Sequence, residues 1–129
     1  MTVLDASALL TYFFGEPGSV EVQKRLPGSV IHTVNYAEVL SKLAERGVSP
    51  EQAQQQLEQT GLAQVIRIDP GEVGDALEVA RLRPLTRSVG LSLGDRYCLA
   101  LAQRLGQSVA TTDRAWATLN LGLTIEVLR

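Results

Sequence analysis

Cysteine and histidine are nearly absent from this 129-residue chain, which has one residue of each. The single cysteine, Cys98, cannot form an internal disulfide, and one cysteine with one histidine cannot complete a zinc site of the usual ligand types. Cys98 also lies in an apolar segment, residues 97–102, which favours a small buried hydrophobe over a catalytic thiol. A metal ion in this protein would therefore need oxygen ligands.

Long apolar runs are also missing, since no stretch approaches the roughly 18 residues that span a bilayer. Residues 1–14 lack both the basic opening and the small-residue cleavage site of a secretory signal. We therefore expect a cytoplasmic protein with no membrane partner. The net charge of −2 gives no overall indication of nucleic-acid binding, which would have to depend on local positive charge.

Short segments rich in β-formers alternate along the chain with longer stretches of helical spacing. The predicted strands are residues 2–5, 29–32, 65–68, 108–111 and 124–127. This alternation predicts an α/β fold around a central, mainly parallel sheet of about five strands. The length suits one sizeable core, so residues 1–129 are expected to form a single domain.

Two predicted helices carry acidic residues of interest. In Thr33–Arg46, the spacing of Tyr36, Leu40 and Leu43 predicts the buried stripe, which places Glu38 on the opposite side with Lys42 as a surface ion-pair partner. The helix Leu93–Leu105 has almost no polar face and is expected to be packed on most sides. Three prolines are expected in the first turns of other helices: Pro17, Pro50 and Pro70.

Four carboxylates are placed to meet at one edge of the predicted sheet. Asp5 directly follows the first strand, and Asp113 follows the strand at 108–111 after one threonine. Asp95 lies in the opening turn of its helix, and Glu38 lies in the second turn of the helix after residues 29–32. The loops at the carboxyl ends of parallel strands open on the same edge, where ligands usually bind.

Each of these acids also has a structural interpretation. Asp5 and Asp113 could cap the helices that follow them, and Ser92 with Asp95 matches a capping box. Taken together, however, four carboxylates at one edge would repel one another unless a cation neutralised them. Mg²⁺ or Mn²⁺, as one or two ions, prefers such oxygen ligands and acts on phosphodiesters without a side-chain nucleophile.

Four stretches of the sequence resemble the PIN-domain ribonucleases, and within them the VapC-type toxins. The stretches are VLDASALL at 3–10, AEV at 37–39, LSLGD at 91–95 and ATTD at 110–113. The resemblance implies a three-layer α/β/α PIN-like domain and a metal-dependent endoribonuclease that is the toxin of a bacterial toxin–antitoxin pair. It further implies that Asp5, Glu38, Asp95 and Asp113 are the catalytic and metal-binding residues, supported by hydrogen bonds from Ser7, Ser92 and Thr111.

The resemblance also implies partners, namely an RNA substrate, a cognate antitoxin and a second copy in a homodimer. Tyr12, Phe13 and Phe14 on the first helix would suit an interface, or would simply complete the core. Arg87 and Arg96, which flank the acidic site in sequence, are predicted to contact RNA phosphates. A solvated face with surface ion pairs, such as Arg81 with Glu78, is the alternative for the neighbouring arginines.

Two other functions fit an α/β layout. The first is phosphoryl transfer or phosphatase chemistry on a strand-end aspartate, but such domains usually need a late lysine, and the only lysines here are Lys24 and Lys42. The second is a PIN-like module for binding or interaction without turnover. The presence of all four acids argues against that alternative.

Overall fold

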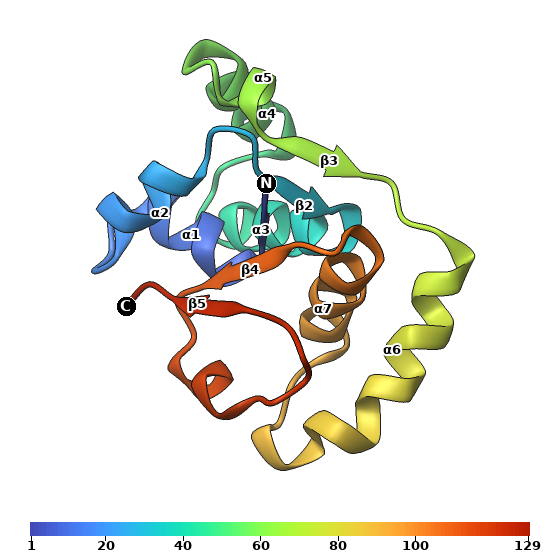
Figure 1. The fold of residues 1–129 in the computed structure, drawn as a ribbon. Coiled ribbons are helices and arrows are strands. Elements are labelled where there is room, and N and C mark those ends of the chain that lie inside the picture. The colour runs from blue at the N-terminus through green and yellow to red at the C-terminus, as the bar shows by residue number, and fades with distance from the viewer.

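The computed structural model describes all 129 residues and contains one five-stranded sheet in the order β3-β2-β1-β4-β5 (Figure 1). Every neighbouring pair is parallel. The strands are β1 (Thr2–Leu4), β2 (Val30–His32), β3 (Arg67–Asp69), β4 (Ser108–Thr111) and β5 (Ile125–Val127). The predicted parallel sheet of five strands is thus confirmed, with β3 displaced toward its carboxyl end because the preceding residues are helical.

Seven α-helices and two short 3₁₀ helices surround the sheet. They are α1 (Ala6–Phe14), α2 (Ser19–Arg25), α3 (Thr33–Glu45), α4 (Pro50–Gln59), α5 (Leu62–Val65), α6 (Val73–Thr86), η1 (Arg87–Val89), α7 (Leu93–Leu105) and η2 (Arg114–Thr118). None of them has both the length and the apolar character that a membrane span requires.

The prolines mark helix starts with mixed accuracy. Pro50 is the first residue of α4, where its missing amide hydrogen leaves no helical bond unmade. Pro17 and Pro70, in contrast, precede α2 and α6, so their predicted places inside a first turn are wrong. Gly18 caps α2 in a left-handed conformation and Glu72 caps α6 with an extended one, and these residues set the observed starts.

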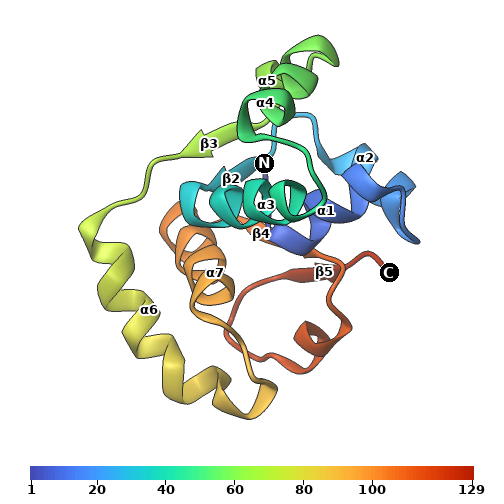
Figure 2. The same ribbon diagram turned by 180° about the vertical axis from the view of Figure 1, so that it is seen from behind.

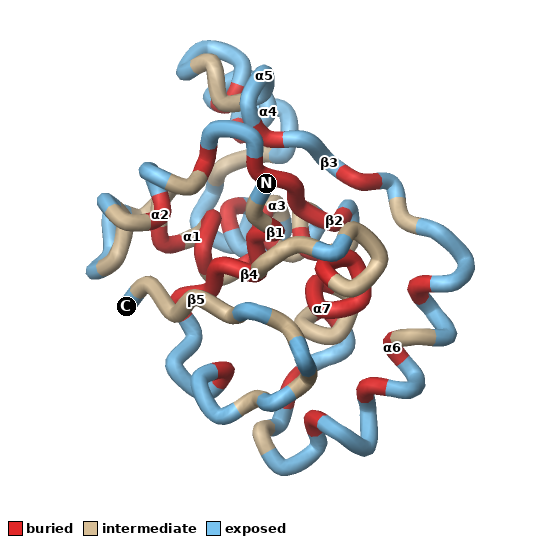
Figure 3. The backbone as a smooth tube through the Cα atoms, in the orientation of Figure 1, coloured by how far each residue is buried: buried red, intermediate tan, exposed pale blue.

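Alternation along the strands divides the core into two halves, one on each face of the sheet. Val3, Val30 and Val109 pack with α6, α7 and Trp116 of η2, whereas their neighbours Leu4, Ile31 and Ala110 pack with α1 to α4. Figure 3 shows buried backbone concentrated in the central strands and in α7, while α6 is buried along one side only. The chain therefore forms three layers, α/β/α.

The strand order creates a switch point beside β1. From β1 the chain moves through β2 to β3 on one side, then returns to place β4 on the other side. The loops after β1 and β4 consequently leave the same edge of the sheet in different directions. The crevice between two such loops is where ligands bind in open parallel sheets. Figure 2 shows α3 in front of the strands, with α1 at one of its ends and α7 below it.

Candidate functional site

Asp5 follows β1 and caps α1 at the switch point. Its carboxylate accepts a hydrogen bond from the Ala8 amide at 2.8 Å and from the Thr111 hydroxyl at 2.6 Å. The Ser7 hydroxyl lies 2.8 Å from both carboxylate oxygens. Asp5 is 2% exposed, so almost all of its interactions are with the protein.

Burial raises the pKa of Asp5 from its ordinary value of 3.8 to about 7. The hydrogen bonds from Thr111, Ala8 and Ser7 favour the ionised form and oppose this rise, whereas the negative charge of Asp95 adds to it. No positive side chain acts on the carboxylate. Asp5 is therefore an acid whose negative charge is held by neutral donors and is not neutralised.

Glu38 lies on α3 opposite the start of α7, not on an isolated surface. Its Oε1 accepts a hydrogen bond from the Asn35 amide at 3.0 Å, and the same amide donates to the Gly94 carbonyl at 2.8 Å. Lys42, which the structural alternative for Glu38 offered as a surface partner, forms its ion pair with Glu45 at 3.6 Å. Burial and the charge of Asp95 raise the pKa of Glu38, whereas the hydrogen bond from Asn35 and the charge of Lys42 oppose this rise.

The buried stripe of α3 differs from the prediction, and this difference explains the position of Glu38. Asn35, Val39 and Leu43 are the buried residues, whereas Tyr36 and Leu40 are half-buried. The helix contacts α1, α4 and α7 at once, so its buried face is broader than a single stripe and is shifted by one residue. This shift turns Glu38 toward α7.

Asp95 is half-exposed and belongs to a capping box at the start of α7. Its Oδ2 accepts from the Ser92 amide at 2.9 Å, while its own amide donates to the Ser92 hydroxyl at 3.1 Å. The predicted capping box is present, and it leaves the carboxylate close enough to raise the pKa of both Asp5 and Glu38. Asp95 can therefore cap α7 and also belong to the acidic group.

One hollow of about 430 Å³ joins these elements. Glu38 and Asp95 line it together with Ser7, Ala6, Leu10, Val34, Ala37, Ser41 and Lys42. Beneath it lies the Cys98 thiol, whose pKa is raised by burial and by the negative charges of Asp5, Asp95 and Glu38. Glu38 of α3 and Asp95 of α7 thus share this hollow, and Asp5, which caps α1, lies next to it through its hydrogen bond with Ser7.

Asp113, the fourth acid, is exposed at the edge of this group. Its side chain caps η2 by accepting from the Ala115 amide at 3.0 Å. Its own amide donates to the Thr111 hydroxyl at 3.0 Å, and that hydroxyl donates to Asp5. Asp113 is therefore linked to Asp5 through Thr111, and its carboxylate contacts none of the other three.

The three predicted supporting residues all contact an acid of the group: Ser7 and Thr111 contact Asp5, and Ser92 contacts Asp95. The two predicted RNA-contacting arginines differ from each other. Arg87 is exposed in η1, whereas Arg96 is half-buried and donates to the Val79 carbonyl at 2.9 Å.

Two residues of the site were missed from sequence, Asn35 and Gly94. Asn35 lies three residues before Glu38, a spacing that places both side chains on one helix face. At Gly94, an added Cβ would overlap the Glu38 carboxylate. Gly94 therefore permits the close approach of Glu38, and its position next to Asp95 was the available signal.

A second polar cluster, also missed, lies beyond the ends of β2 and β3. His32, Asp69 and Asp75 are buried, and one ligand atom of each lies within 4.8 Å of the others, so the trio could in principle hold a metal ion. Arg104 of α7 already binds both acids, at 2.7 Å from Asp69 and 2.9 Å from Asp75. His32 donates to Asp75 at 2.9 Å and accepts from the Val34 amide at 3.1 Å, which caps α3.

Both acids of this second cluster are paired with Arg104. The Arg104 guanidinium lowers the pKa of Asp69 despite burial. Burial alone would raise the pKa of Asp75, but hydrogen bonds from Arg104, His32 and the Glu72 amide outweigh burial and lower it. The cluster around Arg104 is therefore an internal ion-pair network. The group of Asp5, Glu38 and Asp95 differs because none of its carboxylates forms an ion pair with a cation of the chain, and carboxylate oxygens suit a hard divalent cation.

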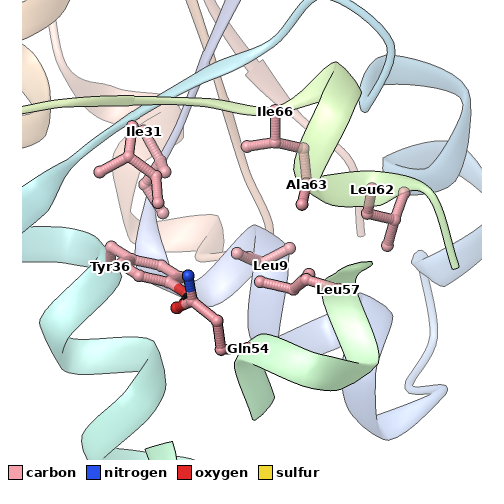
Figure 4. Close-up of a pocket in the computed structure, with 9 residues that line it drawn as sticks. Leu9, Ile31, Tyr36, Gln54, Leu57, Leu62, Ala63 and Ile66 are labelled. Atoms are coloured by element: carbon pink, nitrogen blue, oxygen red, sulfur yellow. Dashed lines mark hydrogen bonds between the residues drawn. The ribbon is translucent and has the colours of Figure 1, made fainter. Parts of the chain in front are cut away.

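An apolar cavity of about 110 Å³ lies apart from both clusters (Figure 4). It is enclosed by side chains of α1, β2, α3, α4 and α5, including Leu9, Ile31, Tyr36, Leu57 and Ile66. Gln54 is the one polar residue of its lining, and its side-chain oxygen accepts from the Tyr36 hydroxyl at 3.0 Å. This cavity offers no group for acid–base or metal chemistry.

Comparisons with known proteins agree with the geometry. The PIN domain family model matches residues 2–120. Comparison with curated proteins gives no match. A toxin-antitoxin complex from Klebsiella pneumoniae is similar, with a TM-score of 0.69 and 20% identity over 92% of each chain.

Two further solved structures match over nearly their whole length. FitAcB from Neisseria gonorrhoeae has a TM-score of 0.68 and 19% identity, covering 98% of this chain and 96% of that one. VapBC2 from Rickettsia felis, bound to a DNA fragment from its promoter, has a TM-score of 0.70 and 13% identity, covering 99% and 98%. At these identities the similarity establishes a common fold.

Proposed function

Because this chain belongs to the PIN domain family, we propose that it is a metal-dependent endoribonuclease that hydrolyses RNA phosphodiester bonds and acts as the toxin of a bacterial toxin–antitoxin pair. The observation that carries the proposal is the hollow that Glu38 and Asp95 share, with buried Asp5 next to it behind Ser7; burial and the charge of Asp95 raise the pKa of both Asp5 and Glu38. Such a group gains most from a bound cation.

We propose that the cation is Mg²⁺ or Mn²⁺, as one or two ions, held by Asp5, Glu38, Asp95 and Asp113. These carboxylates are hard oxygen ligands, which both ions prefer. When bound, such an ion supplies positive charge to the phosphodiester and acidifies the water that attacks it. The chain offers no activated side-chain nucleophile at this site, which favours attack by water.

The remaining residues would orient the ligands. Ser7, Thr111 and the Ala8 amide fix the Asp5 carboxylate in one position, and Asn35 does the same for Glu38. Ser92 orients Asp95 through the capping box. Fixed ligands lower the cost of assembling the site around the cation.

RNA contact and protein partners complete the proposal. Arg87, exposed beside α7, remains a proposed phosphate contact, whereas Arg96 could contribute only the part of its guanidinium that Val79 does not use. An antitoxin partner is proposed by analogy with the complexes to which this fold is similar. A homodimer through Tyr12, Phe13 and Phe14, all half-buried on α1, and a cytoplasmic location are further parts of the proposal.

The test is an RNA-cleavage assay on the purified chain without partner. We expect cleavage of single-stranded RNA with Mg²⁺ or Mn²⁺, and loss of at least about 100-fold in rate on adding EDTA or in Asp5→Asn and Asp95→Asn, because each change removes metal or its ligand. Glu51→Gln is the matched control, since Glu51 is an exposed acid on α4, and its rate should equal that of wild type.

Cleavage that survives EDTA and both substitutions would contradict the metal mechanism. A chain that binds Mn²⁺ but never cuts RNA would support the non-catalytic interaction module instead. Release of phosphate from a small phosphomonoester, without cleavage of RNA, would favour the phosphatase alternative. These outcomes separate the three functions.

A further inference from the structure

A second hollow opens directly beside the acidic one. Its volume is about 310 Å³, and it shares Ser7, Leu10 and Lys42 with the hollow that contains Glu38 and Asp95. The two hollows adjoin at these three residues, and together we call them the groove, which borders α1 and the carboxyl end of α3. In Figure 2 this end of α3 lies beside α1.

Positive charge gathers at the second hollow. Lys42, Arg46 and Arg129 line it, against the two acids Glu16 and Glu45. The one ion pair of Lys42 is with Glu45, at 3.6 Å, and the two side chains are 60% and 68% exposed. Because an exposed pair contributes little to stability, Lys42 can exchange Glu45 for a phosphate at little cost. Arg129, at the far end, pairs with Glu16 at 3.4 Å.

Arg46 is the best-prepared of these cations. It forms no ion pair, and its guanidinium lies 3.9 Å from the centroid of the Phe14 ring. Stacking on a ring holds the guanidinium in place while its N–H groups stay free at the edge. A guanidinium that is held but has no carboxylate partner is suited to bind a phosphate through two hydrogen bonds.

Hydroxyl groups line the floor between the acids and the cations. Ser7, Thr11 and Thr112 all border the second hollow. The Thr11 and Thr112 hydroxyls are 2.9 Å apart, and the Thr112 amide donates to Ser7 at 3.2 Å. Lys42 lines both hollows, so a positive charge borders the acidic hollow as well as the second one, and cations beside an acidic site suit a ligand with repeating phosphates.

We propose that the RNA strand leaves the acidic site along this second hollow, with Lys42 and Arg46 binding the phosphates next to the cleaved bond. This inference rests on the proposed nuclease function and adds the direction of the strand. It places the main phosphate contacts on α3, on the side of the site away from Arg87.

The test measures RNA binding apart from cleavage. In an Asp95→Asn background, which is expected not to cut, the Kd of a fluorescein-labelled single-stranded RNA is measured by anisotropy with Mg²⁺ at several salt concentrations. We expect Lys42→Met with Arg46→Met to weaken binding by about tenfold or more and to make the salt dependence shallower by about 0.7 per lost phosphate contact. Methionine keeps the apolar stems of both side chains and removes only their charged ends, and the Tm of the double variant checks that it folds.

Arg81→Met with Arg83→Met is the matched control, because it removes two exposed positive charges from α6, on the far side of the molecule (Figure 1). Equal Kd and salt dependence in the two double variants would overturn the groove proposal. The proposal would also be overturned if Arg87→Met weakened RNA binding more than Lys42→Met with Arg46→Met. That result would place the RNA on the side of Arg87.

The two levels of proposal fail separately. If the wild-type chain cuts RNA but the α3 variants bind it like the control, only the groove is wrong. If the wild-type chain cuts no RNA, yet RNA binding still depends on Lys42 and Arg46, the groove stands and the nuclease function falls.

Discussion

At the scale of single residues, the site depends on acids held by neutral donors. Asp5 receives hydrogen bonds from two hydroxyls and an amide, and Glu38 from one side-chain amide. Neutral donors fix the direction of a carboxylate without cancelling its charge, so the charge remains available to a cation. Arg104 illustrates the opposite case, in which a cation from the chain itself satisfies two buried acids.

The raised pKa of Asp5 predicts a pH effect on stability. A carboxylate with an ordinary value of 3.8 and a folded value of about 7 destabilises the metal-free fold as it ionises. The folded state binds the extra proton between these two values, so the free energy of unfolding should fall as pH rises from about 4 to 7. Relative to Asp5→Asn, the free energy of unfolding should fall by on the order of 4 kcal/mol over this pH range, since one pKa unit corresponds to about 1.4 kcal/mol.

Urea unfolding in EDTA at pH 5, 6, 7 and 8 checks this prediction. Asp5→Asn cannot titrate, so the wild-type curve should drop relative to it over that range and level off above pH 7. Parallel curves for the two proteins would mean that Asp5 ionises without cost in the folded state.

Gly94 offers a second test at this scale. Alanine there would place its Cβ against the Glu38 carboxylate, a flexible end that can move away and leave the site. We expect Gly94→Ala to cut RNA at least about tenfold more slowly while its Tm stays equal or rises, because alanine favours a helix by about 1 kcal/mol over glycine. Gly74→Ala on α6, where the added methyl meets nothing, is the control and should keep full activity.

At the scale of elements, the ends of β2, β3, α6 and α7 are tied together by one ion-pair network. Arg104 reaches from α7 to Asp69 at the end of β3 and to Asp75 on α6, and Asp75 in turn holds His32, which precedes α3. His32 caps the helix that carries Glu38. The network therefore sets the relative positions of helices that contribute to the acidic site.

Removing Arg104 should destabilise the fold strongly. Arg104→Met leaves buried Asp75 without its arginine and Asp69 with only Arg67, at 3.9 Å, and breaking a buried pair costs about 3–5 kcal/mol. The lowered pKa of Asp69 and Asp75 gives stability above about pH 4 that is lost below it, so the difference from wild type should shrink in acid. Chemical unfolding at pH 7 and pH 3 measures both effects.

Arg81→Met provides the comparison for Arg104. Arg81 pairs with Glu78 at 3.1 Å, but its side chain is 67% exposed, so its loss should cost about 1 kcal/mol or less. Equal losses for the two variants would show that the Arg104 network contributes no more than a surface pair.

At the scale of the whole molecule, the acidic group joins both halves of the core, because Asp5 begins α1 on one face of the sheet and Asp95 begins α7 on the other. A cation bound between them should stabilise the entire fold. We expect EDTA to lower the Tm at neutral pH, since an ion at 100 times its Kd contributes about 2.7 kcal/mol. Calorimetry with and without Mn²⁺ measures this, and an unchanged or higher Tm on chelation would contradict a shared metal site.

The sequence by itself determined the parallel sheet, the helix α7 and the convergence of Asp5 and Asp95. These features follow from local pattern and strand direction, since alternation and periodicity are written in neighbouring residues and parallel strands end at one edge. The same reasoning identified the caps at Asp5, Ser92 and Asp113, whose geometry involves residues at most three positions away.

Only the tertiary structure decided the face of α3, the approach of Glu38 to Gly94 and the binding of two acids by Arg104. Each depends on elements distant in sequence, and helical spacing cannot tell which of two adjacent stripes is buried when a helix packs on three neighbours. The partner of each buried carboxylate was likewise decided by contacts between elements distant in sequence. Whether a carboxylate meets an arginine or a neutral hydroxyl is fixed by packing, and that difference separates the Arg104 network from the candidate metal site.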